Sequence, residues 1–383
     1  MKRRDFIKTL GASLVVFQTA PLVNAAQLLA GKKAKKPKVI WIVLRGAMDS
    51  LHTIVPTFDP ALAKLRPSLY SGIKDQLLML DRGYALHPAL TNLHQWYQEQ
   101  QLLPIVAVSS GYQKRSHFDG QDFLESGLSQ INHDSGWLGR AAELKQTQAL
   151  AVARSTPISL RSANNVNTWY PSKLKDADTD TYQALMALYQ YDELLLKRLQ
   201  QGLSTQKMAG ASLKNLTRQG KFANLTKACA KLMVGDNGVD CAMLELTGWD
   251  THNNQQPRIA RQLKQLDHGL GLLKEGLGQQ WQYTVVIVAT EFGRTAMENG
   301  TKGTDHGTAS AMFIAGGAVK GGRVLGQWPG LASEQLFEQR DLMPTSNTFS
   351  WIANILATHW AMSDQQIKQI FPDIAVIKQQ LIT

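Results

Sequence analysis

Short apolar runs alternate with segments of helical periodicity along most of the chain. The runs predict buried strands of a parallel sheet, because they lack polar alternation and are rich in β-branched residues; they cover residues 38–44, 103–108, 239–246 and 283–289. From Ile259 to Leu277, apolar residues recur at spacings of four and three, as on one helix face. Asp267 and His268 are expected on the solvent side of that helix. Residues 181–203 and 213–233 are also predicted to be helical, and this alternation indicates an α/β fold with a mostly parallel central sheet in a three-layer α/β/α sandwich.

The beginning of the chain predicts an exported protein. The stretch MKRRDFIKTLGASLVVFQTAPLVNAA combines a basic start, an uncharged apolar segment and small residues near Ala25, as in a secretory signal. Its RRDFIK resembles a twin-arginine signal. The alternative is a membrane anchor, because residues 9–31 carry no charge. We expect a signal peptide at 1–26, a basic linker at 27–38 and a single domain at 39–383, with the twin-arginine translocase as partner during export and a periplasmic mature form that does not span the membrane.

Composition narrows the class of protein. The hydrophobic fraction of 44% is enough for a substantial core. The formal charge of +11 comes partly from the signal and the linker, and the body shows no alternation of arginine with aromatic residues, so nucleic-acid binding is not expected. The chain has no dinucleotide or haem signature, which counts against a redox enzyme. Cys229 and Cys241 can either pair or remain thiols, and their spacing fits no zinc motif.

Polar residues follow each of the four predicted strands. Carboxyl ends of parallel strands meet at one edge of a sheet, where ligands gather. Taken singly, an Asp after a strand is usually a helix cap or a turn residue. Together these side chains supply the carboxylates and imidazoles that bind zinc, manganese and similar ions, so they predict a metal site. The residues concerned are Asp49, Ser116, His117, Asp250, His252, Glu291, Asp305 and His306.

Ser116 stands directly before HFDGQDFLESG, which is predicted to be a helix. At a helix N-terminus, backbone N–H groups and a metal ion can stabilise an alkoxide, so Ser116 is a candidate nucleophile. The alternative is an ordinary helix cap. No GxSxG elbow surrounds the serine, and metal activation is therefore favoured over a serine–histidine–acid triad.

Five motifs occur in a fixed order, namely LRGAMDSL, RSHFDGQDFLESG, GWDTH, TEFGRT and TDHGTA. As a set they resemble the twin-arginine-exported family called domain of unknown function fifteen-oh-one (DUF1501), within the alkaline phosphatase and sulfatase superfamily. The resemblance extends over nearly all of residues 39–330. It implies an alkaline-phosphatase-like fold.

The resemblance also implies roles for the polar residues. Asp250, His252 and His306 would bind a first ion, Asp49 and Glu291 would serve a second, and Asp305 or His117 would supplement the set. Ser116 would be the nucleophile with His117 beside it, and Arg294 or Arg115 would hold the substrate oxyanion. Phe292 follows Glu291 where the superfamily has a ligand, so both one ion and two ions remain open.

Two functions are compatible with these expectations. The first is a metal-dependent hydrolase that uses one or two zinc, manganese or calcium ions to cleave an anionic phosphate or sulfate ester. The second is a non-catalytic periplasmic binding or assembly protein on a degenerate version of the same fold.

Overall fold

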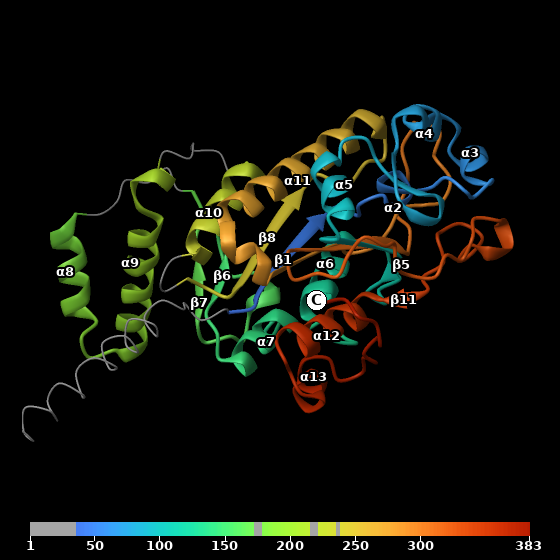
Figure 1. The fold of residues 1–383 in the computed structure, drawn as a ribbon. Helices are drawn as coiled ribbons and strands as arrows, with labels where there is room; N and C mark the ends of the chain where they lie inside the picture. Colours follow the sequence, from blue (N-terminus) through green and yellow to red (C-terminus); the bar gives the residue numbers. More distant parts are fainter. Residues whose placement is uncertain (1–35, 172–177, 215–220, 235–237) are drawn as a thin grey trace, which may run out of the picture. The chain divides into compact units, whose positions relative to one another are not determined.

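The computed structural model describes residues 36–171, 178–214, 221–234 and 238–383, and the side chains up to residue 207 in the second of these ranges. Within them one large sheet has the strand order β11-β5-β10-β9-β1-β8-β6-β7 (Figure 1). All neighbouring strands are parallel except where β10 pairs with β5 and β9. In chain order the strands are β1 (Lys38–Arg45), β5 (Leu102–Ser109), β6 (Ala149–Ala151), β7 (Val166–Thr168), β8 (Cys241–Thr247), β9 (Thr284–Thr290), β10 (Ser310–Ala315) and β11 (Ser346–Asn347). The mostly parallel sheet predicted from the apolar runs is confirmed.

Each face of the sheet is buried under helices. Side chains alternate along β1, so Ile40 and Ile42 enter one core while Trp41 and Val43 enter the other. Full burial of such side chains contributes about 1.5–3 kcal/mol each, which explains why the runs are apolar on both faces. Figure 1 shows the two helical layers on opposite sides of the sheet, completing the predicted three-layer sandwich. The first layer comprises α5 (Thr91–Gln98), α10 (Phe222–Val234) and α11 (Gln255–Leu277), and the second α6 (His117–Ser126), α7 (Trp137–Lys145), α12 (Thr348–His359) and α13 (Asp364–Ile370).

Smaller elements complete the described part of the chain. A second sheet has the order β2-β4-β3. Its first strand, β2, follows the end of α2 directly in the chain. These elements are α2 (Ser50–Thr53), β2 (Ile54–Pro56), α3 (Leu62–Leu65), α4 (Pro67–Ser71), β3 (Leu78–Met79), β4 (Tyr84–Leu86), α8 (Thr179–Leu188) and α9 (Glu193–Lys214).

Two helical predictions need correction. The segment 181–203 is two helices, because Asp192 accepts a hydrogen bond from Leu195 N at 2.9 Å and so begins α9. Asp267 was expected in solvent but is 4% exposed. Its carboxylate accepts hydrogen bonds from the backbone N–H groups of Asn92 and Leu93, at the beginning of α5. Of the predicted helix at 213–233, residues 215–220 lie outside the described residues.

Two further expectations concern the sulfur atoms and the membrane. Cys229 and Cys241 are buried, unpaired thiols, which decides between the two alternatives left by the sequence. None of the helices in the described ranges has the length and apolar character needed to cross a membrane. The predicted signal at 1–26 and most of the linker lie outside the described residues and stay predictions.

Candidate metal centre

The carboxyl ends of the central strands bring distant polar residues together. Asp250 follows β8, Glu291 follows β9, and His117 begins the helix after β5. Arg294 and His306 are joined by an isolated antiparallel bridge, which folds the segment after β9 back over this edge. The polar residues predicted to share one edge of the sheet therefore do so, although their contacts differ.

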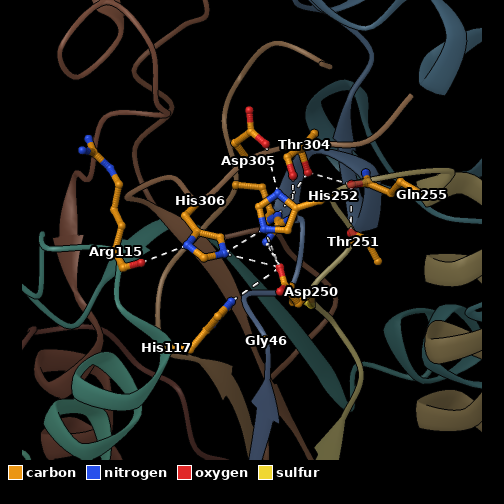
Figure 2. A network of polar contacts seen from close by, with 12 residues as sticks. Gly46, Arg115, His117, Asp250, Thr251, His252, Gln255, Thr304, Asp305 and His306 are labelled. Atoms are coloured by element: carbon orange, nitrogen blue, oxygen red, sulfur yellow. Dashed lines mark hydrogen bonds and ion pairs between the residues drawn. The ribbon is translucent and has the colours of Figure 1, made fainter. Parts of the chain in front are cut away.

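Three imidazole rings point an Nε2 atom at the same carboxylate oxygen (Figure 2). Asp250 Oδ1 lies 2.9 Å from His252 Nε2, 3.4 Å from His306 Nε2 and 3.5 Å from His117 Nε2. The Nε2 atoms of His252 and His306 are 3.0 Å apart. These four side chains form what we call the His–Asp cluster.

The opposite nitrogen of each ring, Nδ1, contacts an oxygen that can only accept a hydrogen bond. The contacts join His117 to Glu291 Oε1 at 2.8 Å, His252 to Asp305 Oδ1 at 3.0 Å and His306 to the Arg115 carbonyl oxygen at 2.9 Å. Each Nδ1 therefore carries a proton, and in the neutral ring the Nε2 lone pair faces the centre of the cluster. Metal-binding histidines are oriented by partners of this kind.

The His–Asp cluster fits a divalent ion. A four-coordinate ion with bonds of about 2.0–2.1 Å holds its ligand atoms about 3.3–3.4 Å apart. The four separations given above, 2.9–3.5 Å, are close to this value. Among the described residues, His117, Asp250 and His306 offer ligand atoms that lie within 4.8 Å of one another, and His252 contacts two of these three residues. Within the part of the chain that the structure describes, His117 Nε2 is buried and makes no hydrogen bond. Burial lowers the pKa of His117, but its contacts with Glu291 and Asp250 outweigh burial and raise it, so a protonated His117 balances part of the negative charge when no ion is bound. When His117 is neutral, as metal binding requires, the carboxylates of Asp250, Glu291 and Asp305 beside the Arg294 guanidinium leave two negative charges, which a divalent cation would balance.

The surroundings keep the carboxylates ionised. Burial raises the pKa of Asp250 and of Glu291. The hydrogen bond and the charge of Arg294 outweigh burial for Asp250, and the hydrogen bonds led by that of His117 outweigh it for Glu291, so both pKa values lie below their ordinary values. The hydrogen bond from His252 likewise lowers the pKa of Asp305. Burial and the neighbouring His117 lower the pKa of His306, so this ring is neutral near pH 7. A neutral ring is the form that binds a metal ion.

The Arg294 guanidinium binds and orients the Asp250 carboxylate. Its side chain is buried, and its NH1 group donates to Asp250 Oδ1 at 2.8 Å. Its Nε donates to Thr304 Oγ1 at 3.2 Å, and its NH2 to the Thr304 carbonyl oxygen. Arg115, the other residue expected to hold an oxyanion, points away from the cluster (Figure 2) and pairs with Asp341 at 2.8 Å.

Asp49 lies outside the His–Asp cluster. It forms an ion pair with Arg66 at 2.6 Å, with both side chains only 1% exposed. Its Oδ2 also accepts from Gln255 Nε2, and Gln255 Oε1 accepts from the Thr304 hydroxyl. Because Thr304 accepts a hydrogen bond from Arg294, this buried network holds Arg294, and through it Asp250, in position.

In the chain, Ser116 lies between Arg115, whose carbonyl oxygen contacts His306, and His117, which belongs to the cluster. It is the N-cap residue of α6, yet its side chain makes no capping hydrogen bond. The Ser116 side chain therefore does not cap the helix. Its hydroxyl remains available for another partner.

Two glycines allow the segment 303–307 to approach the cluster. A Cβ atom on Gly303 would lie 2.1 Å from the His252 carbonyl oxygen, and one on Gly307 would lie 2.5 Å from the backbone of Arg294. Both distances are impossible for a real side chain. The spacing in GTDHG thus reflects backbone packing on both sides of His306.

The sequence missed two features of this site. His117 was assigned to catalysis with metal binding as a supplementary role, and its contact with Glu291, 174 residues away, was not foreseen; both roles stay predictions. Arg66 was not foreseen at all, since a single arginine before a proline carries no local signal. The ligand roles predicted for Asp49, Glu291 and Asp305 stay predictions; here these residues contact Arg66, His117 and His252, respectively.

Solved structures with similar folds are distant relatives at most. Ps i-CgsB in complex with k-i-k-neocarrahexaose is 11% identical with a TM-score of 0.39, covering 87% of this chain and 74% of that chain. The C-terminal periplasmic domain of EcEptC from Escherichia coli, in complex with Zn, is 9% identical with a TM-score of 0.36, covering 74% of each chain. Murine ectonucleotide pyrophosphatase/phosphodiesterase 5 is 10% identical with a TM-score of 0.32, covering 68% of this chain and 57% of that chain.

All three TM-scores are below 0.5, so the site has to be interpreted from this chain's own residues. Among curated proteins, none matches the chain by sequence. A family model, by contrast, matches residues 87–371, which is more than half of the chain. Four of the five motifs lie within the matched residues, and the chain belongs to the family described as Protein of unknown function (DUF1501).

Proposed function

We propose that this chain is an exported hydrolase of phosphate or sulfate esters that works with one divalent metal ion and uses Ser116 as its nucleophile. The observation that carries the proposal is the convergence of three Nε2 atoms on Asp250 Oδ1, with each Nδ1 held by an acceptor. When bound, the ion would stabilise negative charge on oxygen and promote ionisation of a nearby hydroxyl.

The residues around Ser116 have defined tasks in this proposal. Ser116 Oγ forms a bond to phosphorus or sulfur, the ester P–O or S–O bond breaks, and the departing alkoxide takes a proton to leave as the alcohol. Water then hydrolyses the serine ester to release phosphate or sulfate. The first backbone N–H groups of α6, next to Ser116 in the chain, favour the anionic group electrostatically. Arg294 holds Asp250 in place.

Elemental analysis of the purified protein tests the metal, with His306→Ala and the exposed His268→Ala as a matched pair. We expect one equivalent of zinc, manganese or calcium in the wild type and in His268→Ala, and almost none in His306→Ala. Ser116→Ala should keep its metal and lose turnover of 4-nitrophenyl phosphate or sulfate, whereas Ser129→Ala, an exposed serine, should retain both. A metal-free wild type, or an active Ser116→Ala protein, would overturn the proposal.

A non-catalytic binding protein is the second candidate, and the openness of the site favours it. The side chains of Asp250, His252 and Asp305 are 44%, 41% and 53% exposed, whereas catalysis usually benefits from the exclusion of water. This alternative predicts a metal-loaded protein that hydrolyses no phosphate or sulfate ester. It also predicts that the wild type and Ser116→Ala behave identically.

Export through the twin-arginine pathway to the periplasm forms part of the proposal and is supported by RRDFIK near the N-terminus. Replacing Arg3 and Arg4 with lysine preserves the charge but removes the paired guanidinium groups. We expect the wild-type protein in the periplasmic fraction and the double variant in the cytoplasm. Equal export of both proteins would contradict this route.

A further inference from the structure

A cavity of about 440 Å³ opens beside the His–Asp cluster. This volume lies within the range of small-molecule binding sites. Aliphatic side chains contribute much of its wall, and Asp305 and Arg340 line the side that faces the cluster. The lining residues on which the argument rests are Leu65, Met297, Leu331, Leu336, Asp305 and Arg340.

Two of these residues connect the cavity to the candidate metal centre. Asp305 lines the cavity and also accepts the hydrogen bond from His252 Nδ1 at 3.0 Å. In Figure 2, His252 lies between Asp305 and Asp250. Arg340 NH2 donates to the His306 carbonyl oxygen at 2.8 Å. A molecule in the cavity would therefore be one side chain away from the ion.

Most polar groups of the cavity wall already have partners. The Glu298 carboxylate accepts hydrogen bonds from the backbone N–H groups of Ser68 and Leu69 at 2.9–3.1 Å. Asn299 donates to the His252 carbonyl oxygen and to Asp305. The Thr295 hydroxyl donates to the Met297 carbonyl oxygen. The polar side chains of Ser333 and Gln339 also line the cavity, and Asp305 and Arg340 lie at the side toward the cluster. The rest of the wall is largely aliphatic, so the cavity favours a mainly apolar occupant over a sugar with a hydroxyl on every side.

We propose that this cavity binds the organic group of the substrate, and that this group is an apolar ring or chain rather than a carbohydrate. The assignment to a substrate rests on the proposed function, whereas the affinity of the cavity for apolar molecules does not. Met297 is the best side chain to change, because it is 59% exposed and its replacement leaves the core intact. Met79, on β3, is 55% exposed and provides a matched control.

Two measurements on the full-length, metal-loaded protein test the inference. The first is binding of 1-anilinonaphthalene-8-sulfonate, followed by its fluorescence. We expect Met297→Glu to weaken binding at least about tenfold, equivalent to about 1.4 kcal/mol, and Met79→Glu to leave it unchanged. The second compares cyclohexylmethyl phosphate with glucose 6-phosphate, and the two corresponding sulfates. Both alcohols are primary and carry a six-membered ring, so the members of each pair differ chiefly in polarity.

The wild type should prefer the cyclohexylmethyl ester at least about tenfold in kcat/KM, and Met297→Glu should remove most of this preference by raising KM. Equal turnover of both esters, with no effect of Met297→Glu, would overturn the inference and leave the hydrolase standing. Dye binding that depends on Met297, without turnover of any ester, would refute the hydrolase and the substrate assignment while supporting an apolar ligand site. Dye binding that is equally weakened by Met79→Glu would refute that site as well.

Discussion

Replacing Glu291 with glutamine separates two roles for this residue. The resemblance to the superfamily implies a metal ligand, whereas the structure shows Glu291 Oε1 accepting hydrogen bonds from His117 Nδ1 and Gly46 N, both at 2.8 Å, and from Gln121 Nε2 at 3.0 Å. A glutamine has the same shape, and its carbonyl oxygen can accept from all three donors. The other oxygen, Oε2, accepts from the Thr290 hydroxyl at 2.8 Å, and the glutamine NH2 group would donate to that hydroxyl oxygen instead. Glu291→Gln therefore removes the negative charge and reverses this one hydrogen bond.

The expected magnitude follows from the hydrogen bond to His117. A hydrogen bond that involves a charged group contributes about 1.5–3 kcal/mol and a neutral one about 0.5–1.5 kcal/mol, so the change weakens the support of the ring by about 1–1.5 kcal/mol. That corresponds to about a five- to thirteenfold loss of metal affinity. Loss of an orienting partner typically costs about 10–100-fold, which agrees with this figure. We expect about a tenfold increase in Kd for zinc.

Competition with a zinc-binding fluorescent chelator at neutral pH measures this Kd. Glu275→Gln, on the exposed side of α11, is the matched control and should bind as the wild type does. An unchanged Kd in Glu291→Gln would show that Glu291 does not support His117. A loss well beyond 100-fold would instead identify Glu291 as a ligand of the ion, as the superfamily pattern implies.

Three further changes test the structure around the cluster. In Gly303→Ala the new Cβ would lie 2.1 Å from the His252 carbonyl oxygen, so zinc affinity should fall at least about tenfold. A Cβ on Gly300 would have no atom within 4 Å, so Gly300→Ala should bind zinc as the wild type does. Equal zinc affinities of the two variants would contradict this packing. Burial lowers the pKa of His52 from 6.5 to about 3, so the unfolded state binds more protons between these values and stability falls as the pH decreases through this window. His52→Gln should therefore lose about 2 kcal/mol less than the wild type between pH 7 and pH 5 in chelator-treated urea unfolding, and identical losses would refute the linkage. Arg66→Met leaves a buried carboxylate without its partner and should cost about 3–5 kcal/mol in the same assay; a cost below about 1 kcal/mol would show that the ion pair is unimportant.

The central strands could be predicted because burial on both faces makes each of them a continuous apolar run. β10 was not predicted, since SAMFIA contains small residues and begins with serine, and its antiparallel insertion between β5 and β9 depends on long-range pairing. β6 and β7, with three residues each, are too short for a periodic signal. The break between α8 and α9 was missed because apolar residues of helical spacing occur on both sides of Asp192. Its capping hydrogen bond from Leu195 N, which marks the start of α9, leaves no signal in that pattern.

For the site, the sequence gives the residue types and the strands that carry them, but few of the contacts. His117, His252 and His306 each obtain their orientation from an acceptor that only folding brings near. Local pattern therefore predicts that a metal site is present. It does not distinguish the side chains that face the ion from those that hold them.

The number of ions follows from how the carboxylates are neutralised. Asp49, the residue expected to bind a second ion, is already paired with Arg66 in a region where both side chains are 1% exposed. Burial raises the pKa of Asp49, and the Arg66 guanidinium more than compensates, so the carboxylate stays ionised and its charge is balanced. A second ion would have to displace Arg66 and leave a buried guanidinium without its partner, which is strongly unfavourable. The uncompensated negative charge lies instead around the His–Asp cluster, where a divalent ion would balance it. We therefore expect Arg66 to take the electrostatic place of a second metal ion, and the protein to bind one ion.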